Sequence, residues 1–181
     1  MHIETTRSLL RDFLPEDEQS LIHMASDGSL QEIWGDCSNC HIWMKDFIRE
    51  SAALAQKNDP TKEYLAYAIE EKEKHMLLGS VGCSFYEDLQ EVGLTWFIGA
   101  DHRGKGYMAE ALRAYIHYFF GHYRIPRLIA TIREDNIASW KTAEKAGMVL
   151  EKKAVYQDIY DKEPSLSRFY AVDKSMVAES L

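Results

Sequence analysis

Hydrophobic residues in the first half of the chain follow two spacings, one typical of helices and one typical of strands. Short runs rich in Tyr, Val, Ile, Phe and Trp are separated by polar turns, and such short connections favour antiparallel hairpins. Proline followed by two acids at 15–17 is a typical helix start. The sequence therefore predicts strands at 8–13, 63–70, 77–86 and 92–99. It also predicts one helix that begins at Pro15 and a second helix that covers 41–56.

The second half has a different pattern. After the strand at 92–99 comes a glycine-rich loop, then a helix at 104–120 and a strand at 127–132, which together favour a parallel crossover unit. Asn136 is a good N-cap for a further helix that ends at about 146, before Gly147. Two last strands are predicted at 149–160 and 167–174. The sum is one α/β domain over residues 1–181 with a mixed sheet.

Composition narrows the class of protein. The 181 residues are 46% hydrophobic and 28% charged, as in ordinary globular proteins. A net charge of -8 argues against nucleic-acid binding, which needs clustered Lys and Arg, and it suits a cationic substrate such as an amine. Solubility alone also accounts for this charge. With no export signal and no apolar run of bilayer length, we expect a cytoplasmic protein with no membrane contact.

A cysteine motif offers a competing interpretation. Cys37, Cys40 and His41 match C-x-x-C-H, the attachment pattern of c-type haem. Haem attachment normally implies export, and a zinc site needs further close ligands, whereas the only other cysteine is the distant Cys83. We expect no metal and no haem, and an electron carrier that uses Cys37 and Cys40 is kept as an alternative.

The most informative segment is WFIGADHRGKGYMAEA, residues 96–111. Two glycines, Gly104 and Gly106, let a ligand approach the backbone where a strand passes into a helix. Backbone N–H groups of the first helical turn favour an anion, and Arg103 and Lys105 add positive charge. The segment predicts a pyrophosphate site. It lacks the third glycine of a Rossmann fingerprint and the pattern of a P-loop, and a glycine pair that merely permits a tight turn remains the alternative.

Two blocks together resemble a known family. The glycine segment resembles motif A of the GNAT acetyltransferases, Q/R-x-x-G-x-G/A. Residues 136–148, NIASWKTAEKAGM, resemble the N-x-x-S-x-x-x-x-E-K-x-G-F signature of the RimJ/RimL-type branch, which acetylates ribosomal-protein N-termini. The opening TRSLLR at 6–11, with PED at 15–17, is similar to the same branch.

The resemblance implies a fold and a cosubstrate. The GNAT fold is a mixed, largely antiparallel sheet of about seven strands, flanked by four helices, with a central parallel pair splayed for acetyl-CoA. The backbone of Ile98 and the loop are then expected to hold the pantetheine arm and pyrophosphate. Asn136 and Ser139 are expected to contact the pantetheine and the thioester. Glu110 and Glu144 are expected to be structural. The implied loop residues are Arg103, Gly104, Lys105, Gly106, Tyr107 and Met108.

The sequence departs from the family pattern at two positions. Asp101 stands where the pattern begins with Gln or Arg, which removes a donor but leaves the backbone amides. Ala143 stands where many relatives place a tyrosine that protonates the leaving thiolate. Either Ser139 substitutes in part as a catalytic acid, or CoA leaves unassisted because its thiol is reasonably acidic.

The attacking amine must be neutral. An N-terminal α-amine with pKa near ~7.8 is roughly one seventh free base at pH 7, whereas a lysine-like amine near ~10.4 is neutral about once in two thousand. This favours an α-amine acceptor, although burial of a lysine reverses the order. Glu91 is the candidate base, acting through water, and a solvated turn residue is its alternative role. A backbone N–H within 96–98 is expected to meet the oxyanion.

The predicted function is transfer of an acetyl group from acetyl-CoA to a primary amine by direct attack in a ternary complex. The amine is a peptide N-terminus or a small molecule. The alternative is a non-catalytic acyl-CoA-binding sensor or partner module, which Ala143 keeps open. Trp34, Trp43 and Tyr64 are candidates either for the acceptor cleft or for the core. The acceptor's identity and the oligomeric state, including a homodimer, stay open.

Overall fold

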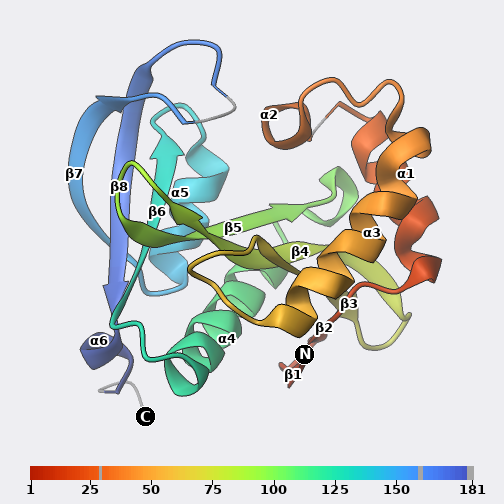
Figure 1. Ribbon diagram of the computed structural model, residues 1–181, viewed down its shortest axis with the longest axis horizontal. Helices are drawn as coiled ribbons and strands as arrows, with labels where there is room; N and C mark the ends of the chain where they lie inside the picture. The colour runs from red at the N-terminus through yellow and green to blue at the C-terminus, as the bar shows by residue number, and fades with distance from the viewer. Residues whose placement is uncertain (29, 159–160, 179–181) are drawn as a thin grey trace.

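In the part of the chain that the structure describes, eight strands form one continuous sheet in the order β1-β2-β3-β4-β5-β6-β8-β7 (Figure 1). The computed structural model describes residues 1–28, 30–158 and 161–178. The strands are β1 His2–Glu4, β2 Ser8–Arg11, β3 Leu65–Glu71, β4 Met76–Tyr86, β5 Glu91–Ile98, β6 Arg127–Arg133, β7 Val149–Tyr156 and β8 Ser165–Asp173. The helices are α1 Glu18–Ser26, α2 Gln31–Trp34, α3 Cys40–Lys57, α4 Tyr107–His122, α5 Ile137–Lys145 and α6 Lys174–Ala178, with short 3-10 turns at Pro15–Asp17 and Ala100–His102.

Neighbouring strands are antiparallel except for β5 and β6, which are parallel. The described parts of β5 and β6 share a single residue pair, Gly93 with Ile129. In contrast, β4 and β5 are paired from Tyr86 with Glu91 to Gly79 with Ile98. Figure 1 shows β5 and β6 running in different directions toward their C-terminal ends. The expected splayed parallel pair is therefore confirmed.

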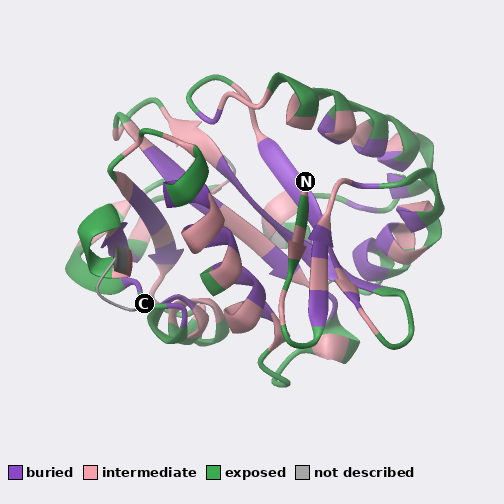
Figure 2. Ribbon diagram, turned by 90° about the horizontal axis from the view of Figure 1, so that it is seen from below, coloured by how far each residue is buried: buried purple, intermediate pink, exposed green. Residues whose placement is uncertain are grey.

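Helices cover both faces of the sheet. Along β3, Leu65, Tyr67 and Ile69 pack in the cluster that contains α4 and α5, whereas Ala66 and Ala68 pack in the cluster that contains α1 and α3. The period of two along a strand sends alternate side chains to opposite faces. Figure 2 shows buried residues along the strands between the two helical layers.

Helix α4 owes its position to a stripe of apolar residues. Met108, Leu112, Tyr115 and Phe119 recur at three- and four-residue intervals, and all are buried. This stripe packs against the sheet and anchors the helix, so its first turn is held at the end of β5. The rigid core thus positions the glycine-rich loop that precedes α4.

The structure corrects several predictions. The sheet has eight strands, not about seven, because β1 is a three-residue strand that carries one half-buried apolar side chain, Ile3. The short helices α2 and α6 also gave no periodic signal. The helix expected from 104 starts at Tyr107, since Gly104 and Gly106 have positive φ. The strand expected at 149–160 ends at Tyr156, and residues 159–160 lie outside the described ranges. Within the described ranges, no helix combines the length and apolar character of a membrane span.

Candidate active site

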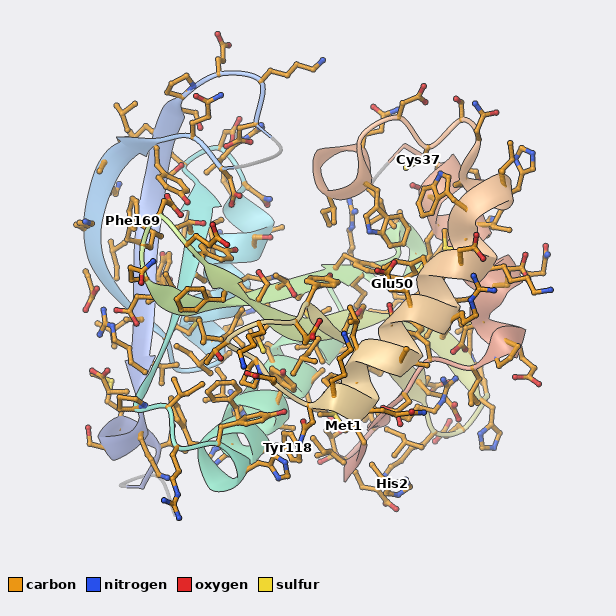
Figure 3. The ribbon with its side chains drawn as sticks, viewed as in Figure 1. Met1, His2, Cys37, Glu50, Tyr118 and Phe169 are labelled. Carbon is orange, nitrogen blue, oxygen red and sulfur yellow. The ribbon has the colours of Figure 1, made fainter. Side chains whose placement is uncertain are left out.

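A large cleft of about 1370 Å³ opens where β5 and β6 separate. Residues 94–97 of β5 contribute to one side, and the end of β6 and the start of α5 contribute to another. Phe47 and Glu50 of α3 line it opposite Tyr156 of β7. Figure 3 shows Glu50 on the flank of α3 that faces the middle of the sheet. The cleft therefore joins the splayed strands to the surface between the N-terminal helices and the C-terminal strands.

The glycine-rich loop lies between β5 and α4. Gly104 and Gly106 have φ of 74° and 82°, a left-handed conformation that L side chains rarely adopt. A Cβ added at either glycine would have no neighbouring atom within 3.4 Å. The backbone conformation, not crowding, therefore explains why glycine stands at both positions. All six residues of the loop except Met108 and Tyr107 are exposed, and the Met108 side chain belongs to the core. Met108 can therefore contribute only its backbone to a ligand.

The first turn of α4 fits a diphosphate. Its first helical hydrogen bond runs from the Glu110 N–H to the Gly106 carbonyl at 3.2 Å, so the N–H groups of Tyr107, Met108 and Ala109 precede the helical ladder. Together with the positive end of the helix dipole, these groups favour a bound anion. The exposed glycines leave the space that a phosphate close to the backbone requires.

Two cations flank this turn. Arg103 Nε donates to the Ile98 carbonyl at 3.3 Å, and Lys105 Nζ donates to the Asp101 carbonyl at 2.8 Å. Both of these bonds go to backbone carbonyl oxygens. Asp101, in the position that the family pattern gives to Gln or Arg, lies 3.9 Å from His23.

Asn136 and Ser139 lie together at the start of α5, and both line the cleft. The Asn136 side-chain oxygen accepts from the Ser139 N–H at 3.2 Å, which is an N-cap. The cap uses the oxygen of the amide and leaves its NH₂ group to donate elsewhere. The predicted helix cap is confirmed, and the predicted contacts to a cofactor stay compatible with it.

Of the predicted site residues, Asn136 and Ser139 line the cleft, whereas Glu91, Ile98 and residues 103–108 are not among its lining in the described part of the chain. Glu91 is the first residue of β5, two residues before the Gly93 that pairs with Ile129 of β6. Its carboxylate Oε1 lies 3.2 Å from the Nε of Arg127. Arg127 also pairs with Glu151 and Asp173. Within the described part of the chain, Glu91 is not among the residues that line the cleft. This geometry gives Glu91 an ion pair instead of a face on the cleft, so the expectation that it acts as a base through water finds no support in its position.

Acidic residues predominate in the cleft, a feature that the sequence alone did not reveal. The acids come from α3, the 61–64 segment, the β4–β5 turn and the segment after β7, far apart in sequence. Among the described residues, the lining acids are Glu50, Glu63, Glu87, Asp88, Asp158 and Asp161, and the lining cations are Lys62 and Arg133. Both cations have a carboxylate partner outside the lining, Asp59 and Asp135 respectively, and Glu63 has Lys57 as its partner outside it. The charge of the cleft is therefore suited to a cationic ligand.

Two tyrosines lie among these acids. Burial raises the pKa of Tyr86, and the negative charge of Asp158 raises it further. Burial also raises the pKa of Tyr156, with a further contribution from its hydrogen bond to Asp88. Both hydroxyls are therefore neutral at pH 7. Neither residue was predicted, because Tyr86 ends a strand and Tyr156 belongs to another strand 70 positions later.

The aromatic residues near the cleft divide between lining and core. Trp34 and Tyr64 line it, whereas Trp43 packs edge-to-face on Trp34 with ring centroids 5.6 Å apart and does not line it in the described part. Cys37 and Cys40 are buried in the α1–α3 cluster. Burial raises the pKa of the Cys37 thiol, which keeps it protonated and unreactive.

The remaining predicted residues have structural partners. Glu110 accepts from Arg7, and Glu144 accepts from the Tyr170 hydroxyl at 2.8 Å. Both observations agree with the structural roles expected for these acids. Ala143 is fully buried on α5, so this position contributes to the core and offers no acid to the cleft.

Comparison with known proteins places the chain in context. The family model of the acetyltransferase (GNAT) domain matches residues 7–149. An N-acetyltransferase of uncharacterized role, YnaD of Bacillus subtilis (strain 168), is 27% identical over 150 residues, 82% of each chain.

Two solved structures share the fold at low identity. RimL, a ribosomal L7/L12 alpha-N-protein acetyltransferase in complex with coenzyme A, has a TM-score of 0.79 at 17% identity and covers 96% of this chain and 98% of its own. The microcin C7 self-immunity acetyltransferase MccE, in complex with acetyl-CoA and AMP, has a TM-score of 0.76 at 18% identity over 93% of both chains.

Proposed function

Because this chain belongs to the GNAT acetyltransferases and is an acetyl-CoA-dependent acyltransferase, we propose that it acetylates a primary amine that carries additional positive charge. The acceptor is a peptide N-terminus followed by basic residues, or a small polyamine-like molecule. This proposal places the protein in the RimJ/RimL-type branch, to which its 136–148 motif and its opening residues are similar. The observation that carries the acceptor class is the excess of acids among the residues that line the cleft.

The proposed division of roles follows the two halves of the site. Residues 103–108 hold the diphosphate of acetyl-CoA, whose thioester supplies the activated acetyl group. Asn136 and Ser139, which lie in the cleft, orient the thioester end. Beyond Gly93 the backbone of β5 has no partner from β6 among the described residues. An N–H of 96–98 on that edge is the proposed oxyanion donor.

The proposed reaction is direct attack in a ternary complex. The amine nitrogen forms a bond to the thioester carbonyl carbon, the carbon–sulfur bond breaks, and the proton lost by nitrogen passes to water while the thiolate of CoA takes up a proton. With Glu91 paired to Arg127 and Ala143 buried, an acceptor amine that is partly neutral at pH 7 reacts more readily than one that is fully protonated. Negative charge in the cleft attracts cationic acceptors but also raises their amine pKa, so α-amines remain favoured over lysine-like amines.

One observation favours the second candidate, a non-catalytic acyl-CoA-binding sensor. Ala143 is completely buried, so the position that carries a tyrosine acid in many relatives contributes nothing to the cleft. A sensor would bind CoA and acetyl-CoA tightly and release no thiol with any acceptor. An enzyme would release thiol with at least one acceptor of the panel described next.

The test is thiol release from acetyl-CoA with matched acceptors. One set comprises short peptides that differ only in the charge of their second and third residues, and another pairs a monoamine with a diamine and a triamine. We expect kcat/KM to rise at least tenfold from the neutral to the doubly basic acceptor and to fall with added salt. Asp88→Asn should reduce this preference, whereas Asp46→Asn, on α3 outside the cleft lining, should not. Equal rates for neutral and basic acceptors would overturn the proposed acceptor class.

A further inference from the structure

Arg7 contacts the back of the glycine-rich loop from a position about one hundred residues earlier in the chain. Its backbone N–H and its Nε both donate to the Glu110 carboxylate at 2.8 Å, and Nη2 lies 2.8 Å from the same group. Its Nη1 donates to the Lys105 carbonyl at 2.9 Å. The guanidinium also lies over the Tyr107 ring, 4.4 Å from the centroid. One side chain thus contacts the loop, the first helical residue and the first turn of α4.

The contact with Lys105 determines how one peptide group is oriented. In a trans peptide the C=O and the following N–H point in opposite directions. Because the Lys105 carbonyl is turned toward Arg7, the Gly106 N–H is turned away from Arg7. Backbone N–H groups of such a loop are the donors that a bound anion needs. Gly106, with φ of 82°, is the residue that permits this orientation.

The charge of Arg7 is engaged by Glu110 and is therefore not offered to a ligand. Burial alone would raise the pKa of Glu110, but hydrogen bonds from Thr5 and Arg7 and the charge of Arg7 hold it below its usual value. Glu110 is therefore ionised at neutral pH. The pair is also only partly exposed, with 42% of the Arg7 side chain and 21% of the Glu110 side chain accessible.

The backbone at Arg7, which directly precedes β2, has its own anchors. Strand β2 pairs with β3 from Ser8 with Glu71 to Arg11 with Ala68, and the Arg7 carbonyl accepts from the Lys72 N–H at 3.0 Å. These backbone bonds remain when the Arg7 side chain is truncated. The side chain is therefore free to serve the loop without being required for the sheet.

We propose that Arg7 is a positioning residue that preorganises the diphosphate grip of the 103–108 loop. This inference rests on the proposed role of that loop in holding CoA. Arg7 does not touch the cosubstrate. It fixes the peptide between Lys105 and Gly106 before the ligand binds. The free energy of binding is therefore not reduced by the entropic cost of ordering the loop.

The experiment compares two donors of the acetyl group. Acetyl-CoA carries the diphosphate, whereas S-acetylpantetheine lacks it. Arg7→Ala should raise the KM for acetyl-CoA at least tenfold with kcat changed less than threefold, and change kcat/KM for S-acetylpantetheine less than twofold. Arg7→Lys keeps the charge but loses the planar fork, and should lose at least threefold in affinity for CoA by calorimetry while its Tm stays near that of the native chain. Arg49→Ala, an exposed arginine paired with Asp46, is the matched control.

The outcomes separate this inference from the proposed function. CoA binding by Arg7→Ala and Arg7→Lys within twofold of the native chain would overturn the role of Arg7 and leave the loop as the CoA site. Equal losses with both acetyl donors would also overturn it, because they would indicate a general structural effect. Failure of the native chain to bind CoA would refute the proposed function, and this inference with it.

Discussion

The ring of Tyr86 lies so close to Gly93 on the neighbouring strand that a Cβ on residue 93 would come within 2.7 Å of two ring carbons. Gly93 is also the residue of β5 that pairs with Ile129 of β6. Absence of a side chain at this position therefore lets an aromatic ring of the cleft lie where the two parallel strands begin to separate. The glycine shapes the cleft as well as the sheet.

Gly93→Ala tests this relationship. The new methyl group must displace the Tyr86 ring, and such overpacking costs about 1–3 kcal/mol. We expect a lower free energy of unfolding in urea and a lower kcat, with CoA affinity within twofold of the native value because the loop is remote. Gly121→Ala, where no atom lies within 4 Å of the added Cβ, should instead stabilise α4 by about 0.5–1 kcal/mol. Unchanged stability and turnover in Gly93→Ala would contradict the claim that the close contact between Gly93 and the Tyr86 ring shapes the cleft.

Two substitutions distinguish the role of Asn136 as a helix cap from its proposed contact with acetyl-CoA. Asn136→Ala removes the N-cap of α5 and should cost about 1 kcal/mol of stability, whereas Asn136→Asp keeps a capping oxygen and should stay within about 0.5 kcal/mol. If the amide NH₂ also contacts acetyl-CoA, both variants raise its KM although only the alanine lowers stability. A KM that changes only when stability changes would reduce Asn136 to a helix cap.

How far the sequence determined the fold can be seen from β5, α4 and β6. Their order was predictable because the period of the apolar residues changes from two to about 3.6 at Gly104 and Gly106. Strand β1 was missed because Ile3 is its single apolar residue and its pairing with Leu10 is a tertiary fact. Local pattern therefore predicts the long elements and not the short edge strand.

The site divides in the same way. Glycines and an N-cap leave a local signal, so 103–108 and Asn136 could be predicted from the sequence. Asp88 and Asp158 gave no such signal, because the two acids are 70 positions apart in the sequence and line the same cleft only in the folded chain. Arg7 was visible only as part of a family resemblance, since its partner Glu110 is 103 residues away. Long-range contacts of this kind have no sequence period to reveal them.

Glu91→Gln decides between an ion pair and a general base. Its partner Arg127 keeps two other carboxylates, and the Glu91 side chain is 35% exposed, so the loss of stability should be at most about 1 kcal/mol. We expect the variant and the native chain to have the same turnover at each pH from 6 to 9, because Glu91 lies outside the cleft lining. A tenfold or larger loss of kcat, greatest at low pH, would show that Glu91 acts as the base after all.

Acid should weaken the link between Arg7 and Glu110. The pKa of Glu110 is lowered in the folded state, so its contribution to stability is present above the unfolded value of about 4.3 and is lost as pH falls through the folded value. Glu110→Gln should therefore be about 1–2 kcal/mol less stable than the native chain at pH 7. This difference should persist at pH 5 and shrink below about pH 4.

Urea unfolding at pH 7, 5 and 3.5 measures this dependence. Glu73→Gln, an exposed glutamate on the β3–β4 turn, is the control and should match the native chain at each pH. A difference between native and Glu110→Gln that is the same at pH 7 and pH 3.5 would mean that the carboxylate charge contributes nothing to this contact.

Isothermal titration calorimetry of CoA with the native chain and its glycine variants tests the central claim. The claim is that backbone amides of 103–108 hold the diphosphate. Gly104→Val and Gly106→Val place a branched side chain at φ of 74° and 82°, which costs about 1–3 kcal/mol and turns the loop amides away from the ligand. We predict one CoA site in the native chain, at least tenfold weaker binding in each valine variant, and native affinity in Gly121→Ala. No heat of binding in the native chain, or equal affinity in all four proteins, would contradict the account.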